Sequence, residues 1–153
     1  MQPQRGGGVK KQCVSVLLLW MGMQEAMAGG GMATDPMRAM QRASEQAIAS
    51  YEQHGTRGLV ADVAECWAQG PGAYCMYLDM VARQVEVAVA LDNGVPVHSF
   101  FARTATVQRA QAVLRRASGD PLTQHRYWEA LDAQTYAIVQ TALAHTPLDV
   151  LPR

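Results

Sequence analysis

The sequence predicts an all-α fold: an irregular bundle of about five helices packed around a central third helix, with one disulfide. Apolar residues recur at spacings of three and four, whereas no stretch alternates apolar and polar residues for long. Asp35-Pro36 and Asp120-Pro121 are typical helix starts, because aspartate caps a helix and proline fits its first position. The turn Gly70-Pro71-Gly72 separates Cys66 from Cys75, so a bond between these cysteines would join two consecutive helices.

The composition is that of one ordinary globular domain. The 153 residues include 13 Lys+Arg and 13 Asp+Glu, and 49% of the residues are hydrophobic. A chain with this hydrophobic content can bury a core, so the sequence argues against a disordered protein. The balanced charge argues against nucleic acid as a partner, because phosphate binding depends on an excess of basic residues.

Residues 1–28 are predicted to be a secretory signal peptide. Arg5, Lys10 and Lys11 precede an apolar run over 13–23, and the small residues Ala26 and Ala28 follow it. The run has about half of the ~20 residues that a membrane-spanning helix needs. We therefore expect cleavage after Ala28, export to the periplasm and no stable membrane insertion afterwards, with an uncleaved anchor as the alternative. Residues 29–34 are then a flexible N-terminus, 35–146 the helical domain and 147–153 a C-terminal tail.

The first two expected helices run over 36–54 and 57–69, and Gly55 separates them. The apolar side chains expected to face the core are Met37, Met40, Ala47 and Tyr51 in the first helix and Leu59, Val60, Val63 and Trp67 in the second.

A third helix over 73–92 is expected at the centre of the bundle, because it is apolar on two opposite sides. One side carries Tyr74, Leu78, Val81, Val85 and Val89, and the other carries Met76, Met80, Val87 and Leu91. Asp79, Arg83 and Glu86 occupy the narrow strip that remains. We expect these three to pair with one another at the surface.

An extended connection over 95–103 leads to a fourth helix over 104–118 and a fifth over 121–145. Pro96 keeps the residue before it out of the helical conformation. The fifth helix has a broad apolar face formed by Trp128, Leu131, Thr135, Ile138, Val139, Ala142 and Leu143.

Cys66 and Cys75 are predicted to form a structural disulfide. They are the two cysteines that remain after signal cleavage, and the expected compartment is oxidising. A redox-active pair is the alternative, although such pairs usually have two residues between the cysteines. No further metal ligand lies close to them in the sequence, so no zinc site is predicted.

Two polar groups of residues are open to two interpretations each. A flank of the fifth helix, formed by His125, Glu129, Asp132 and Tyr136, is either a solvated edge or a site for metal or acid–base chemistry. A basic group around the fourth helix, formed by Arg103, Arg109, Arg115, Arg116 and Arg126, is either an exposed face or a patch for an acidic partner or for anionic lipid head groups.

The connection over 95–103 is the predicted partner-binding segment, with His98, Phe100 and Phe101 as the candidate residues. It is more apolar than a solvated loop requires, and contiguous exposed apolar surface usually marks a binding site. The alternative is that one phenylalanine packs ahead of the Thr104 cap and fixes the entry of the fourth helix.

The pairs Cys66-Trp67, Tyr74-Cys75 and Leu78-Asp79 are followed by Phe100-Phe101 and an Ala/Arg-rich helix. This pattern, over residues 59–117, resembles small exported all-helical proteins of proteobacteria. The resemblance implies a periplasmic helical domain with a disulfide, and it implies no activity and no catalytic residue.

After the signal peptide the sequence contains no recognised nucleophile, metal or phosphate-binding motif, so no catalytic residue, cofactor or metal ligand is predicted. The favoured hypothesis is a small periplasmic interaction protein whose partner is another protein. It would be of the immunity or inhibitor type, or an accessory subunit of an envelope complex. The alternative is a small envelope enzyme that uses the polar flank of the fifth helix.

Overall fold

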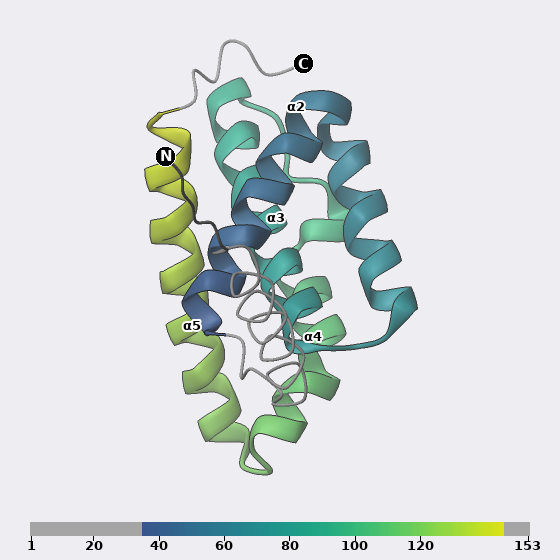
Figure 1. Cartoon of the computed structure of the whole chain (residues 1–153), viewed down its shortest axis with the longest axis vertical. Coiled ribbons are helices and arrows are strands. Elements are labelled where there is room, and N and C mark those ends of the chain that lie inside the picture. Colours follow the sequence, from purple (N-terminus) through teal and green to yellow (C-terminus); the bar gives the residue numbers. More distant parts are fainter. Residues whose placement is uncertain (1–34, 146–153) are drawn as a thin grey trace, which may run out of the picture. The chain divides into compact units, whose positions relative to one another are not determined.

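The computed structural model describes residues 35–145, which contain α-helices, one short 3-10 helix and no strand (Figure 1). The elements are α2 (Pro36–Gln69), α3 (Ala73–Asn93), η2 (Ser99–Phe101), α4 (Arg103–Ala117) and α5 (Pro121–Leu143). The all-α prediction is confirmed, and so is the disulfide between Cys66 and Cys75. The predicted signal peptide, the segment 29–34, residue 146 and the tail lie outside the described residues.

The described residues form four α-helices where about five were expected, because 36–69 is one element. Gly55 interrupts α2 with φ 63° and ψ −159°, so the expected break is at the expected residue, but the chain resumes the helix directly after it. This conformation is essentially confined to glycine. The two segments of α2 therefore stay joined while their axes change direction at Gly55.

The helix starts follow the two Asp-Pro pairs. The Asp35 carboxylate accepts a hydrogen bond from the backbone N of Met37 at 3.1 Å, and the Asp120 carboxylate accepts one from the backbone N of Thr123 at 2.7 Å. Each aspartate thus satisfies one of the free N–H groups in the first turn of its helix. The C-terminal end of α3 is formed by Gly94, which has φ 64° and ends the helix in the left-handed conformation.

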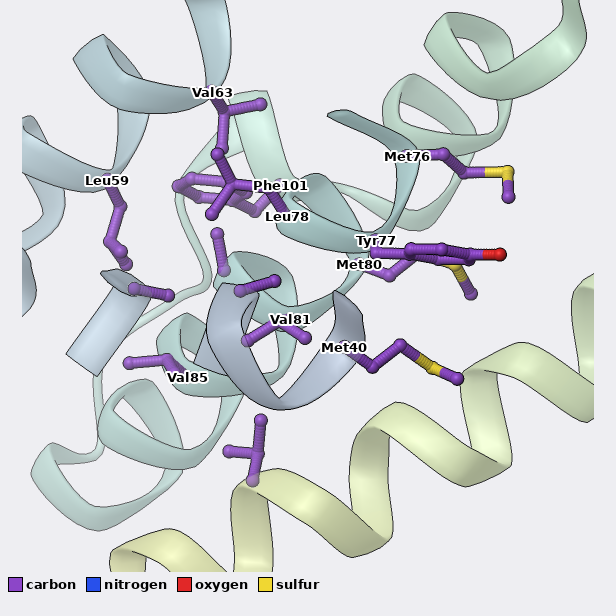
Figure 2. Packing of buried hydrophobic residues seen from close by; sticks show 14 of the residues in the cluster. Met40, Leu59, Val63, Met76, Tyr77, Leu78, Met80, Val81, Val85 and Phe101 are labelled. Atoms are coloured by element: carbon purple, nitrogen blue, oxygen red, sulfur yellow. The ribbon is translucent and has the colours of Figure 1, made fainter. Parts of the chain in front are cut away.

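α3 lies at the centre of the described bundle, as predicted. It contacts α2, η2, α4 and α5, and in Figure 1 it lies between α5 and the second segment of α2. Both of its predicted sides are buried in its first turns: Val81 and Val85 are fully buried, and so is Met80 (Figure 2). An α-helix buried on opposite sides needs neighbours on each of them, and α2, α4 and α5 all contact α3.

The predicted inner faces hold in α5 and fail at two positions elsewhere. Trp128, Leu131, Thr135, Val139 and Leu143 are all buried, and Ile138 packs against the same core. Met37, expected inside, is 42% exposed, and Leu91 at the end of α3 is 77% exposed. Both lie near an end of their helix, where a periodic pattern continues but neighbouring helices no longer cover it.

Candidate functional site

A buried ion pair joins α3 to α4. The Asp79 side chain is 1% exposed, and the Arg109 guanidinium binds both of its oxygens, from Nε to Oδ2 at 2.7 Å and from Nη2 to Oδ1 at 2.8 Å. Trp67 of α2 donates its indole N–H to the same carboxylate at 3.0 Å. The bidentate geometry and the third donor offset the hydration that the carboxylate loses on burial.

The same arginine ties the 95–103 connection to the bundle. Arg109 Nη2 donates to the Phe100 carbonyl oxygen at 2.8 Å, and the guanidinium carbon lies 3.9 Å from the centroid of the Phe100 ring. Trp67, Asp79 and Phe100, which belong to the pattern that runs from Cys66 to Phe101, therefore meet at Arg109. This cluster of four residues links α2, α3, η2 and α4, and we refer to it as the Arg109 cluster.

The expectation that Asp79, Arg83 and Glu86 of α3 pair with one another at the surface is wrong. Asp79 and Glu86 are buried, and neither pairs with Arg83. Arg83 instead lies 3.4 Å from Asp132 of α5, and Glu86 accepts hydrogen bonds from Thr56 and from the backbone of His98. Spacing along one helix could not reveal these partners, because all of them come from other elements.

The connection over 95–103 divides into an exposed and a buried part. Its predicted extended conformation is interrupted by η2, and Phe101 is fully buried in the core cluster drawn in Figure 2. Phe101 therefore contributes to the core and offers no exposed apolar surface, which corrects the premise on which it was selected. Phe100 is half-buried under Arg109, and His98 is exposed. A partner contact through His98 or Phe100 stays a prediction.

Ion pairs occupy the predicted polar flank of α5. Glu129 pairs with Arg103, and Asp132 accepts hydrogen bonds from Gln84 at 2.8 Å and from Arg83 at 3.4 Å. His125 and Glu129 also line a pocket of about 560 Å³ between α4 and α5. Both carboxylates of this flank are thus held by basic or amide side chains.

Two hollows lie on either side of the last turns of α3. The α3–α5 groove has a volume of about 440 Å³, and its lining includes Val87, Ala88, Leu91, Tyr136, Gln140 and Leu143. The α2–α3 hollow has a volume of about 390 Å³, and its lining includes Tyr51, Thr56, Glu86, Val89, Asn93 and Val95. Leu91, Val95 and Tyr136 are more than half exposed, so apolar surface borders both hollows.

The sequence analysis predicted neither the Arg109 cluster nor the exposed end of α3, although the sequence contained one indication of the cluster. Asp79 stands in an otherwise apolar stretch that the fold buries on both sides, so its charge required a basic partner from elsewhere in the chain. The exposure of Leu91 had no such signal, because its spacing from Val87 continues the apolar stripe.

Within residues 35–145, no helix has the length and apolarity to cross a membrane, and no three His, Cys, Asp or Glu side chains gather where they could bind a metal ion. Comparison of the chain with family models, curated proteins and solved structures returns no match.

Proposed function

We propose that this protein is a small periplasmic interaction protein, of the immunity or inhibitor type or an accessory subunit of an envelope complex, and that it binds another protein at the end of α3. The disulfide supports an oxidising compartment, and the apolar run over 13–23 with its preceding basic residues supports export. The sequence placed the partner at His98, Phe100 and Phe101. The proposed surface keeps the exposed part of that connection and adds the neighbouring groove.

The observation that carries this proposal is the pair Leu91 and Tyr136 on the α3–α5 groove. Leu91 is 77% exposed and Tyr136 is 53% exposed, and they line the same groove from two helices. Tyrosine and leucine at a concave apolar surface are suited to receive an apolar side chain or a helix of a partner. Val95 extends the apolar surface beyond the groove, since it is 54% exposed.

Site-specific photo-crosslinking in the native compartment tests the proposal. A photoreactive phenylalanine at position 91 or 136 should give the same adduct, identified by mass spectrometry, whereas the matched control at the exposed Gln108 of α4 should not. The identified protein, once purified, should then form a stoichiometric complex with the wild type and fail to do so with Leu91→Asp. Equal adducts at all three positions, or a complex that Leu91→Asp leaves intact, would contradict the proposal.

The enzyme hypothesis has one supporting observation, the position of His125 and Glu129 on the pocket between α4 and α5. It is weaker because Arg103 already pairs with Glu129 and because His125, 66% exposed, lies 3.9 Å from that carboxylate. We therefore favour the interaction protein.

A further inference from the structure

Glu86 of α3 is a buried carboxylate whose hydrogen-bond partners are all uncharged. Its residue is 5% exposed, Oε2 accepts from Thr56 Oγ1 at 2.7 Å, and Oε1 accepts from the backbone N of His98 at 3.0 Å. Within the described part of the chain, no basic side chain lies within ion-pairing distance of it. Asp79, the other buried carboxylate of α3, is fully paired with Arg109.

This difference has an energetic consequence. A buried carboxylate without a counter-ion has lost hydration that only hydrogen bonds offset, and a carboxylate has about four lone-pair sites, of which Glu86 uses two. Its charge also acts on its neighbour: burial raises the pKa of the Tyr51 hydroxyl, and the negative charge of Glu86 raises it further. The position therefore combines unused acceptor capacity with an uncompensated negative charge.

The α2–α3 hollow connects this charge to the surface. Glu86, Tyr51 and Thr56 contribute its polar groups, while Val89 and Val95 contribute apolar ones. Val95 and Asn93 are exposed, and Tyr51 and Glu86 are buried, so the lining passes from solvent to the carboxylate. Such a lining suits a side chain with an apolar stem and a charged end.

We propose that the α2–α3 hollow receives a lysine or arginine side chain of the protein partner, with the Glu86 carboxylate as its counter-ion. The inference rests on the proposed function, since the same partner covers Leu91 and Tyr136 in the groove on the other side of α3. The aliphatic stem packs against Val89 and Val95, and the cationic end donates hydrogen bonds to the free lone pairs of Glu86. A charge that is uncompensated in the free protein thereby becomes a determinant of which partner binds.

The first experiment uses a small probe and the whole mature protein. N-acetyl-arginine methylamide is titrated against it while NMR follows the methyl groups of Val89 and Val95 and the ring of Tyr51. We expect saturable shifts in the millimolar range, and a binding constant at least roughly tenfold weaker for Glu86→Gln. N-acetyl-norleucine methylamide, which has an apolar stem without the charge, is the control ligand and should bind as weakly as the arginine probe binds Glu86→Gln.

Glu86→Gln is suited to this test because it preserves the side-chain shape and removes a buried charge. We expect its melting temperature to equal or exceed that of the wild type, so lost binding cannot be attributed to unfolding. Thr56→Val, which removes one donor to Glu86 and leaves the charge, should keep the probe bound. Absence of saturable shifts in the wild type, or equal binding by Glu86→Gln, would overturn the inference.

The second experiment uses the protein identified by crosslinking at positions 91 and 136. Its affinity for Glu86→Gln should be at least about tenfold lower than for the wild type, and the difference should diminish with added salt. If the partner binds both equally, the inference fails and the proposed function stands. If no partner is crosslinked at positions 91 and 136, the proposed function fails, and the inference that names its partner falls with it whatever the probe shows.

Discussion

The first half and the last turn of α3 have opposite surroundings. From Cys75 to Ala82 every residue is buried, including Met80 and Val81 on opposite sides of the helix. In the last turn Leu91 is 77% exposed, and two hollows lie beside it. The apolar pattern is continuous along the helix, so it shows which residues avoid water and does not show whether this chain or another one covers them.

The largest loss of stability should come from placing a charge on the buried part of α3. Val81→Asp and Met80→Asp each bury a carboxylate without a partner, and each should destabilise the domain by at least about 4 kcal/mol, a large fraction of the stability of a typical domain. Circular dichroism and thermal melting measure the loss of helix. A Met80→Asp protein as stable as the wild type would contradict the burial of this side of α3.

The next largest loss of stability should come from disrupting the Arg109 cluster. Arg109→Ala leaves Asp79 buried and unpaired and should lower the free energy of unfolding by about 3–5 kcal/mol in urea denaturation. Arg103→Ala is the matched control on the same helix, because the Arg103 side chain is 49% exposed and its removal should cost less than about 1 kcal/mol. Equal losses for the two variants would show that burial does not distinguish these ion pairs.

The fold was largely predictable, and these ion pairs were not. Helix starts depend on local chemistry such as Asp35-Pro36 and Asp120-Pro121, and helical faces depend on spacing, so both can be read from the chain. The partners of Asp79 and Glu86 come from residues 12 to 30 positions away, and only the packing of the helices selects them. Spacing on one helix therefore led to the wrong expectation of mutual pairs.

The candidate site could not be predicted for a related reason, because residues that are adjacent in the sequence need not share a surface. His98, Phe100 and Phe101 are contiguous in the sequence, but the 3-10 turn of η2 separates them in space, with Phe101 in the core and His98 in solvent. Leu91 and Tyr136, which line one groove, are 45 positions apart, as their residue numbers show. A surface formed by two helices has no contiguous signature in the chain.

The disulfide attaches the buried end of α3 to α2, and its removal should cause a smaller loss of stability. It joins residues nine positions apart, so in the loop-entropy model the double variant Cys66→Ala with Cys75→Ala should lose about 2–3 kcal/mol of unfolding free energy. Alkylation of the purified native protein before and after reduction tests the bond. Free thiols in native material would contradict it.

Tyr77 provides a pH test of the same buried end. Burial and a hydrogen bond with Tyr127 raise the pKa of the Tyr77 hydroxyl from 10.0 to about 12. Because the folded-state pKa is the higher one, this stabilisation is complete below pH 10 and is lost as pH rises from 10 to 12. The loss should be roughly 1 kcal/mol over the first pH unit above 10.

Short urea denaturation experiments at increasing pH measure this loss. Tyr77→Phe should show a weaker decline in unfolding free energy above pH 10, whereas Tyr136→Phe, which alters an exposed tyrosine, should decline as the wild type does. Identical pH dependence in all three proteins would argue that Tyr77 does not titrate with unfolding.

The smallest effect on stability is expected at Leu91, and it concerns the exposed end of the helix. Leu91→Asp places a carboxylate where the side chain is already 77% exposed, so no buried charge is created and the free energy of unfolding should change by no more than about 0.5 kcal/mol. An aspartate near the C-terminus of a helix is slightly unfavourable, because its charge meets the negative end of the helix dipole, which sets the expected sign as a small loss.

The same substitution should nevertheless abolish partner binding, because it puts a charge into an apolar contact that the partner would have to desolvate. Binding lost at unchanged stability assigns Leu91 to an interface. A loss of several kcal/mol would instead mean that the last turn of α3 is covered by this chain itself, and the two ends of the helix would then serve the same structural purpose.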